Sequence, residues 1–327
     1  MPRLNHQSRM AGVVRVCAGG LLLGGLATSA SASILVNADF GAGYTANASL
    51  SGQSGSSDVR LAGTWNTNVT GSADHASQLT VLAATGSNNL TYNVSGGGTL
   101  SSTNVLQFVS NSGAVVQWFG RNLSSSISGQ DVYARLLLKP VNGSYNSGTR
   151  LNWFMYAGTT IPSPGNSSLS TGLGQLGPGG STNSLATQNL EATIGTSTTN
   201  NAIAKATPGI TNGTVDLLVA KYAWDATSKT YNSVSFWLNP AYGDSATPIA
   251  TASITSGNAN LGQLGLTTAN LSAAGGTGSV TYDFANFAVG TTWQDVVPAA
   301  VPEPASLGLA LVGLGLLAGG WRPRRSA

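Results

Sequence analysis

The sequence contains one cysteine, Cys17, and two histidines in 327 residues. Cys17 lies within residues 1–32, whose pattern predicts removal during export, so the mature protein has no thiol and forms no disulfide bond. His75 is the only histidine beyond that segment, and one histidine without cysteine cannot provide the usual ligands of a zinc site. No Gly-x-Ser-x-Gly motif supplies a serine nucleophile for His75. We therefore expect no thiol, zinc or serine-triad chemistry.

Charged residues are also scarce and make up 8% of the sequence. The chain has 14 Lys and Arg against 11 Asp and Glu, a formal charge of +3. Six of the basic residues and one of the acidic ones lie in the terminal segments 1–32 and 298–327. The chain between them has eight basic and ten acidic residues, a charge of −2. The pI of about 9.1 therefore belongs to the termini and does not indicate a nucleic-acid partner.

Glutamate is nearly absent between the terminal segments, where Glu191 is the only one. Glycoside hydrolysis usually needs two carboxyl groups a few ångströms apart, one as acid and one as base or nucleophile. No second acid follows Glu191 at strand spacing, and a pair of aspartates from separate strands would leave no sequence signature. We interpret Glu191 as a solvent-facing strand residue and predict that the protein is not an enzyme.

The first 32 residues have the pattern of a secretory signal peptide. Basic residues open the segment, the apolar stretch 16–26 is too short to span a bilayer, and the small residues Ala30 and Ala32 form a cleavage site. We predict export through the Sec translocon and cleavage after Ala32.

The last residues have three parts in a fixed order. The motif Pro302-Glu303-Pro304 comes first, and its prolines favour an extended backbone that an enzyme can recognise. An uncharged apolar run, 307–321, follows and can enter a bilayer. The chain then ends with three arginines, which resist translocation. These are Arg322, Arg324 and Arg325.

This order resembles the PEP-CTERM sorting signal of Gram-negative bacteria, which is processed by an exosortase, a membrane protease-transpeptidase. The resemblance implies an exosortase partner, transient insertion of 307–321 in the inner membrane, and a final place at the cell surface or in the extracellular matrix. The alternative is a plain membrane anchor. The apolar run is short for that role, because a stable span needs about 20 apolar residues.

Between the termini, apolar and polar residues alternate with the period of two that is typical of half-buried strands. Val132, Ala134 and Leu136, for example, alternate with Tyr133 and Arg135. We predict strands at 34–40, 59–65, 79–83, 90–94, 105–109, 115–119, 132–139, 151–156, 190–194, 215–222, 233–238, 249–254, 262–266 and 279–289. Many short antiparallel strands in about 265 residues predict one all-β sandwich, residues 33–297. The sorting tail is then 298–327.

Two further features are interpreted as connections. Residues 162–184 are rich in Gly, Pro and Ser and are predicted to form a surface loop, where a sandwich commonly carries a binding site. The pentapeptide LGQLG occurs at 173–177 and again at 261–265. Nothing around it repeats, so it is attributed to chance or to two similar turns.

Three stretches of the body together resemble the concanavalin A-like, or laminin-G-like, jelly rolls that often precede PEP-CTERM tails. The first runs from Tyr44 through GQSG at 52–55 to Trp65, the second spans 217–240, and the third is FAVGTTW at 287–293. The resemblance implies a concanavalin A-like jelly-roll β-sandwich. It has one departure. Relatives often carry an acidic pair and an arginine in the last strand, where this chain has Ala285, Asn286 and Ala288.

Aromatic residues are the remaining lead to a binding site, because a flat ring with a polar edge can stack on a sugar. Trp118 and Trp153 lie in apolar runs and are interpreted as core residues. Trp224 stands next to Asp225 in a context typical of a loop, and it is the candidate sugar contact. No cofactor is predicted. Calcium stays open, with Asp225 and Asp283 as possible ligands, although no spaced Asp-x-Asp loop is present.

The sequence as a whole predicts a non-catalytic exported protein that an exosortase sorts, with a structural or adhesive role in an exopolysaccharide or biofilm matrix. The alternative is a carbohydrate-binding module with an aromatic sugar site. An atypical glycoside hydrolase comes third.

Overall fold

The computed structural model describes residues 34–69, 79–110, 117–142, 150–156, 172–176, 178–179, 189–195, 201–206, 210–269 and 280–300. In these residues the regular structure is almost entirely antiparallel β-strand, in two large sheets and one hairpin. The exceptions are the 3-10 turn η2 (Gly86–Asn88) and the short helix α1 (Trp293–Val296).

The larger sheet has nine strands in the order β17-β16-β15-β9-β19-β7-β4-β2, with β1 paired to β19. Its strands are β1 (Ile34–Ala38), β2 (Ala48–Ser49), β4 (Leu79–Ala83), β7 (Asn104–Ser110), β9 (Val132–Asn142), β15 (Asp216–Asp225), β16 (Thr230–Leu238), β17 (Ala250–Asn258) and β19 (Val280–Gly290). Ile34 is the partner of Gly290, so the first and last strands lie side by side.

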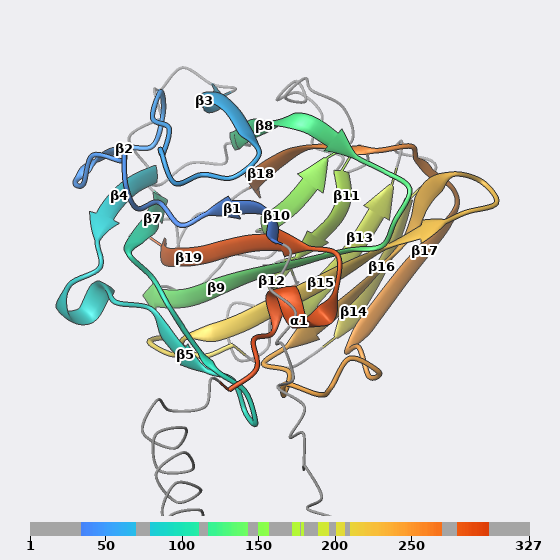
Figure 1. The fold of residues 1–327 in the computed structure, drawn as a ribbon. Helices are drawn as coiled ribbons and strands as arrows, with labels where there is room; N and C mark the ends of the chain where they lie inside the picture. Colours follow the sequence, from blue (N-terminus) through green and yellow to red (C-terminus); the bar gives the residue numbers. More distant parts are fainter. Residues whose placement is uncertain are drawn as a thin grey trace, which may run out of the picture. The chain divides into compact units, whose positions relative to one another are not determined.

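The smaller sheet has eight strands in the order β11-β13-β12-β10-β18-β8-β3, with β14 paired to β13. Its strands are β3 (Leu61–Val69), β8 (Gln117–Ile127), β10 (Arg150–Tyr156), β11 (Gly172–Leu176), β12 (Pro178–Gly179), β13 (Asn189–Gly195), β14 (Asn201–Ala206) and β18 (Leu261–Ala269). Figure 1 shows the two sheets stacked face to face.

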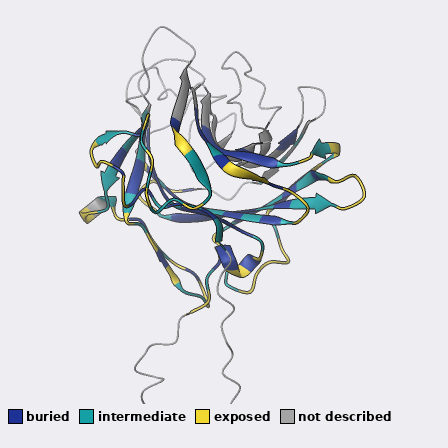
Figure 2. Ribbon diagram, turned by 45° about the horizontal axis from the view of Figure 1, so that its top comes forward, coloured by how far each residue is buried: buried dark blue, intermediate teal, exposed yellow. Residues whose placement is uncertain are grey.

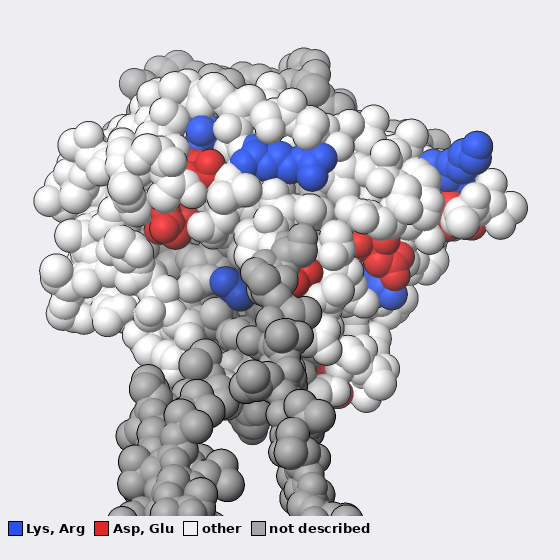
Figure 3. Space-filling view, viewed as in Figure 1, with Lys and Arg blue, Asp and Glu red and all other residues white. Residues whose placement is uncertain are grey.

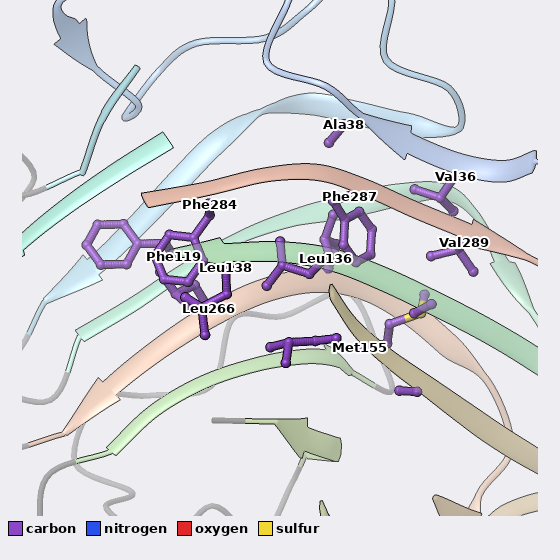
Figure 4. Packing of buried hydrophobic residues seen from close by; sticks show 14 of the residues in the cluster. Val36, Ala38, Phe119, Leu136, Leu138, Met155, Leu266, Phe284, Phe287 and Val289 are labelled. Carbon is purple, nitrogen blue, oxygen red and sulfur yellow. The ribbon is translucent and has the colours of Figure 1, made fainter. Parts of the chain in front are cut away.

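Apolar side chains from both sheets fill the space between them. Leu136 and Leu138 of β9 and Phe284 of β19 lie opposite Leu266 of β18 and Met155 of β10 (Figure 4), and all five are at most 1% exposed. Successive strand residues point to opposite faces, so the sequence alternation places one set of side chains in this interior. Truncating one such aliphatic side chain to Ala typically costs about 2–5 kcal/mol, so this core dominates the stability of the sandwich.

A second apolar cluster lies on the outer face of the nine-stranded sheet. The hairpin of β5 (Thr91–Asn93) and β6 (Thr99–Ser101) packs there together with α1. Leu100 of the hairpin and Val296 of α1 join Leu137, Val219 and Ala285, which point outward from the sheet. Figure 2 shows α1 as mostly buried, while the strand ends and turns around it are exposed.

The prediction of one all-β sandwich is confirmed, and each of the 14 predicted strands overlaps a strand of the structure. Ends differ most in β8, which continues eight residues beyond the predicted end at 119. That continuation is GRNLSSSI, which lacks the apolar alternation that marked the other strands. The β-propensity of this segment is low, and its pairing with β3 on one side and β18 on the other holds it extended.

The prediction of a loop at 162–184 is wrong in part, because β11 and β12 lie within it. The two LGQLG pentapeptides are not turns. The first falls mainly in β11 and the second in β18, and these strands pair with opposite edges of β10, where Met155 is the partner of both Leu173 and Leu264. Glycine-rich composition concealed β11, whose neighbours supply the hydrogen bonds that its low β-propensity does not favour, whereas β18 was predicted as a strand at 262–266.

Candidate functional site

The residues predicted to direct export and sorting lie outside the described residues. They are the cleavage residues Ala30 and Ala32, the motif residues Pro302, Glu303 and Pro304, the apolar run 307–321, and the basic residues Arg322, Arg324 and Arg325. The described chain ends at Ala300, two residues before the motif, so the structure defines the junction between the sandwich and the tail.

The junction begins with α1, a single turn that carries its own cap. Asp295 Oδ2 accepts hydrogen bonds from the backbone N–H groups of Thr291 at 2.9 Å and Thr292 at 2.8 Å. A carboxylate at the N-terminus of a helix accepts hydrogen bonds from N–H groups that have no partner within the helix. Its negative charge also interacts favourably with the positive end of the helix dipole. Asp295 is 5% exposed, so this cap belongs to the packed surface of the sandwich.

Trp293 fixes α1 against the outer face of the nine-stranded sheet. Its ring lies edge-on to Trp237, with centroids 5.1 Å apart, and to Tyr133, with centroids 6.3 Å apart. The indole Nε1–H donates to the carbonyl oxygen of Tyr242 at 2.8 Å. Offset and edge-to-face aromatic pairs add to the stabilisation from buried area. The chain leaving β19 is therefore held by an aromatic cluster before it reaches the tail.

Arg135 of β9 ties α1 to the last strand. Its Nε donates to Asn286 Oδ1 at 2.9 Å, and its Nη1 donates to the carbonyl oxygens of Asp295 and Val296, both at 3.3 Å. These carbonyls form the C-terminal end of the helix, where a positive charge is favourable. Burial lowers the pKa of Arg135 to about 10, so the guanidinium still carries its charge at neutral pH.

Asn286 explains the departure noted in the last strand. It has φ of 53° and lies in an irregularity of the β19–β9 pairing between Ala285 and Ala288. Asn tolerates this left-handed conformation better than most residues. Its Oδ1 binds Arg135, while its Nδ2 donates to the carbonyl of Ser101 in β6 at 2.8 Å. An amide here links the hairpin, the arginine and α1, which the small residues beside it could not do.

The hairpin β5–β6 holds the chain after α1. Gly97 forms an isolated antiparallel bridge with Ala299, and Gly98 N–H donates to the carbonyl of Pro298 at 2.9 Å. A Cβ on Gly97 would lie 2.6 Å from the Pro298 oxygen, and a Cβ on Gly98 would lie 2.6 Å from the Ala299 oxygen. Glycine is therefore required at both positions for the outgoing chain to approach this closely.

Trp224, the candidate sugar contact, is not in a loop. It lies in β15, is partly buried against the core between the sheets, and stacks edge-on with Tyr231 at 5.0 Å between centroids. Its backbone N–H donates to Asp131 Oδ1 at 2.9 Å. An irregularity between Ala223 and Trp224 interrupts the strand alternation, and this concealed the residue's packing role in the sequence.

The two aspartates considered for calcium are separate. Asp225 ends β15 and accepts hydrogen bonds from Thr227 N–H and the Ser228 hydroxyl, both at 2.8 Å, and the Ser228 bond is the main reason that its pKa is lowered. Asp283 is 1% exposed in β19 and accepts from Gln107 Nε2 at 2.9 Å. Burial raises its pKa. In the described part of the chain no three His, Cys, Asp or Glu residues form a metal-binding group.

The outer face of the eight-stranded sheet has a different character from the core. Gln263 of β18 alternates with the core residues Leu264 and Leu266, yet it is only 1% exposed. Its Nε2 donates to Asn122 Oδ1 of β8 at 3.0 Å. Gly120 and Gly265 are register partners beside this pair. Gln263, Gly120 and Gly265 are buried, and Asn122 is partly buried.

Aromatic residues share the register of this face. Trp118 is the partner of Thr267, Phe154 of Gly265, and Tyr156 of Gln263. Directly opposed residues of an antiparallel pair lie on the same face. Trp118 therefore shares a register face with Gly120 and Asn122, while the neighbouring Phe119 is buried. The side chain of Trp118 lies outside what the structure describes, so its interpretation as a core residue stays a prediction. Trp153 is the partner of Leu266, and its interpretation as a core residue also stays a prediction.

Of the glutamate and the histidine weighed for catalysis, the structure describes only Glu191. Glu191 lies in β13 opposite Lys205 of β14, next to the buried Ala192. His75 lies outside the described residues. The register partner of Glu191 is a lysine, so this pairing brings no second carboxyl group beside Glu191.

A buried polar network connects Tyr44, Asp58 and Trp65 near the start of the sandwich. Tyr44 donates to Asp58 Oδ2 at 2.6 Å and accepts from Trp65 Nε1 at 2.8 Å. Arg121 of β8 forms an ion pair with Asp58 and donates to the Tyr44 oxygen. Burial, followed by the hydrogen bond to Asp58, raises the pKa of Tyr44 above its ordinary value. The phenol therefore stays neutral at neutral pH.

Sequence reasoning missed Arg135, Asn286 and the pair Gln263–Asn122. A lone arginine at an alternating position in an apolar strand, as in 132–138, is the one signal that pointed to Arg135. The other residues are Asn and Gln in a chain rich in amides, and only the strand register singles them out.

Comparison with known proteins identifies the tail. Residues 300–325 match the PEP-CTERM protein-sorting motif. The match includes Pro302, Glu303, Pro304 and the following apolar run, so the predicted sorting signal is confirmed, and this motif indicates export and membrane-associated sorting. None of the helices in the described residues is long and apolar enough to span a bilayer.

The sandwich is similar to several solved structures at low identity. One is the endo-β-1,4-glucuronan lyase of the fungus Trichoderma reesei, with 13% identity, a TM-score of 0.40, and coverage of 72% of this chain and 98% of that one. The globular domain of T. cruzi calreticulin has 10% identity, a TM-score of 0.38 and coverage of 77% and 94%. The carbohydrate recognition domain of Emp47p has 12% identity, a TM-score of 0.37 and coverage of 67% and 99%.

These similarities concern the fold and assign no activity to this chain. The two stacked antiparallel sheets confirm the predicted all-β sandwich. A comparison with curated protein sequences finds no match.

Proposed function

We propose that the protein is a non-catalytic cell-surface protein of a Gram-negative bacterium with a structural or adhesive role in an exopolysaccharide or biofilm matrix. In this proposal Sec exports the chain, the inner membrane holds 307–321 transiently, and an exosortase processes the tail. The observation that supports it is the position of the sorting motif, which follows directly after a folded sandwich whose last residues are anchored by Arg135, Trp293 and the hairpin.

The experiment that tests sorting replaces Pro302, Glu303 and Pro304 by Ala. The stiff extended motif is lost while the sandwich keeps all its contacts, so full-length protein should accumulate in the inner membrane. Immunoblots of membrane and extracellular fractions, in a host with its own exosortase, measure this. Pro323→Ala is the matched control, since it removes a proline from the basic end. Normal release of the triple-alanine variant would refute sorting.

The absence of catalysis is part of the proposal and is supported by the chemistry of the available groups. Glu191 is the only glutamate of the body and is paired in register with Lys205. Tyr44 is neutral and engaged with Asp58, and Asp283 is buried beside Gln107. We expect no hydrolysis or elimination on common neutral or acidic polysaccharides. Turnover that disappears in Glu191→Gln or in an Asp-to-Asn variant would contradict this.

Carbohydrate binding is the second candidate function, and one specific observation favours it. The outer face of the eight-stranded sheet combines the hydrogen-bonded amides Gln263 and Asn122 with the register positions of Trp118, Phe154 and Tyr156. Amide donors and acceptors next to flat aromatic groups are the combination that binds sugar hydroxyls and apolar sugar faces. We propose this face, in place of Trp224, as the polysaccharide-binding surface.

Affinity electrophoresis on gels containing matrix polysaccharides tests this candidate. The double variant Phe154→Ala/Tyr156→Ala should lose the mobility shift, because stacking area is removed without a change of charge. Trp224→Ala is the control, since Trp224 belongs to the nine-stranded sheet. Loss of binding in Trp224→Ala with retention in the double variant would return the site to Trp224 and refute the sheet-face assignment.

A further inference from the structure

The junction between sandwich and tail places the sorting motif close to a fixed surface. The chain is held through Ala299 by its bridge to Gly97 and by the hydrogen bond from Gly98 to Pro298. Pro302 follows Ala299 by three residues, and three extended residues span at most about 11 Å. The hairpin β5–β6 therefore lies within about 11 Å of the start of the motif whatever path the chain takes.

An enzyme that encloses the motif cannot avoid this surface. A folded domain of about 100 residues already has a radius of gyration of about 13 Å, which exceeds the available span. The body of the processing enzyme and the hairpin must then approach each other while the motif occupies the active site. Opening the junction instead would break the Gly97–Ala299 bridge and expose Trp293 and Val296, which are at most 5% exposed.

The chemistry of the hairpin suits such a contact. No charged residue occurs between positions 76 and 120, and the exposed residues of the two hairpin strands are Thr91, Asn93, Thr99 and Ser101. In Figure 3 the visible charged side chains lie over other parts of the sandwich. Uncharged hydroxyl and amide groups lose little on desolvation when a partner satisfies their hydrogen bonds, whereas charges are depleted at the centres of interfaces.

We propose that the hairpin β5–β6 is the surface by which the folded sandwich contacts the exosortase during processing of the tail. The inference rests on the proposed sorting function and extends it, because the recognised unit becomes the motif together with a patch of the folded body. The hairpin then has two roles. Its glycines allow the close approach of Pro298 and Ala299, and its exposed threonines are available for the contact.

The experiment adds charge to the hairpin in the full-length chain. Two variants, Thr91→Glu/Thr99→Glu and Thr91→Lys/Thr99→Lys, are compared with the control Ser124→Glu/Ser126→Glu, whose residues are exposed in β8 of the other sheet. Pulse-chase immunoblots in a host with its own exosortase follow conversion to the shortened form. Protease resistance of the membrane-bound chain confirms that each variant is folded.

Both hairpin pairs should slow processing by about tenfold, because either charge must be desolvated at the contact, while the control pair is processed like wild type. A six-residue Gly-Ser insertion between Ala300 and Val301 adds about 13 Å of reach and should make the wild-type and charged hairpins equivalent. That equivalence distinguishes contact at the hairpin from a general defect in folding or export.

Three results would overturn the inference. Wild-type rates in both charged variants would show that the hairpin makes no contact. Slowing by Glu but not by Lys would assign the contact to the anionic membrane surface instead. Slowing that persists in the insertion background would place the defect elsewhere. Failure of the unmodified chain to be processed at all would refute the sorting proposal itself, and the inference with it.

Discussion

The two sheets of the sandwich share one core but differ on their outer faces. On the nine-stranded sheet, outward residues such as Leu137 and Val219 are buried by the hairpin and α1 in a second apolar cluster. On the eight-stranded sheet, the outward positions of β8 and β18 carry Gly120, Asn122 and Gln263. The outer face of the nine-stranded sheet is apolar and covered, and the outer face of the eight-stranded sheet has amides and glycines at these positions.

We propose that the two outer faces have separate tasks. An apolar outer face is favourable only when something covers it, and here the cover is the chain that leads to the sorting tail. The other outer face has an amide pair that shares its register with aromatic residues, which is compatible with a ligand that binds by hydrogen bonds and stacking. Sorting and polysaccharide binding would then use opposite sides of the sandwich, so the tail can be processed without obstructing the ligand surface.

The largest effect is expected from truncating the aromatic residue that seats α1. Trp293→Ala removes the contacts with Trp237 and Tyr133 and the hydrogen bond to the Tyr242 carbonyl. Loss of a buried Trp side chain costs about 3–5 kcal/mol, so the midpoint of thermal unfolding should fall clearly.

Trp293→Phe is the matched control, because it keeps a ring in the cluster and loses the indole donor. It should cost about 1 kcal/mol or somewhat more, the typical effect of one hydrogen bond and a smaller ring. Equal unfolding midpoints for Trp293→Ala and wild type would show that the outer cluster is not an integral part of the fold and would remove the contrast between the two faces.

Sequence reasoning predicted the inner faces of the two sheets, which form the shared core, better than it predicted their outer faces. Alternation in strands such as 132–139 and 279–289 marks residues that point into the core, because one of every two side chains is buried there. The second cluster breaks that pattern. In β9, Leu136, Leu137 and Leu138 are all buried, and a run of apolar residues does not say that an outer face is covered as well as the inner one.

The junction was beyond prediction for a related reason. Helix α1 has four residues, too few to show a helical period, and Gly97 and Gly98 read only as turn residues. Their close approach to Pro298 and Ala299 joins segments some 200 residues apart, and the sequence carries no mark of which glycine meets which partner. The tail itself was predictable because its three parts stand in order along the chain.

An intermediate effect is expected at Asn286, which joins the hairpin to the covered face. Asn286→Ala leaves Arg135 Nε without its partner, frees the Ser101 carbonyl, and places Ala at φ of 53°. We expect a loss of about 2–3 kcal/mol in the free energy of unfolding, measured by urea titration. Asn286→Gly relieves the backbone strain and should recover about 1 kcal/mol of it. A glycine variant no more stable than the alanine variant would contradict the strain argument.

A smaller effect on stability, with a larger one on binding, is expected from filling the other face. A Cβ at Gly120 would lie 3.3 Å from the Gln263 amide carbon, a contact that a side chain can relieve by shifting slightly. Gly120→Ala should therefore change stability by less than about 1 kcal/mol, while a displaced Gln263 weakens retention on polysaccharide gels. Unchanged retention would argue that Gln263 is not part of a binding surface.

The smallest effect is expected at Asp216, near the hairpin. Asp216 is 4% exposed, Asn239 Nδ2 donates to its Oδ1 at 2.7 Å, and its Oδ2 is buried without a hydrogen-bond partner in the described residues. Burial raises the pKa of Asp216 in the folded state, and the charge of Asp216 contributes to the raised pKa of Tyr92 in the hairpin. Asp216→Asn keeps the acceptor for Asn239 and removes a buried negative charge.

The sign of the pH dependence follows from that raised pKa. The folded state binds the proton more tightly than the unfolded chain, so the contribution of Asp216 to stability is fully present below the unfolded pKa of about 3.9 and is lost as pH rises through the folded pKa. Asp216→Asn should therefore be slightly more stable than wild type at pH 7, by less than about 1 kcal/mol, and equal to it near pH 3. Urea titrations at both pH values measure the difference. A variant less stable than wild type at pH 7 would show that the carboxylate is stabilised beneath the hairpin, and that this end of the covered face is polar like the opposite one.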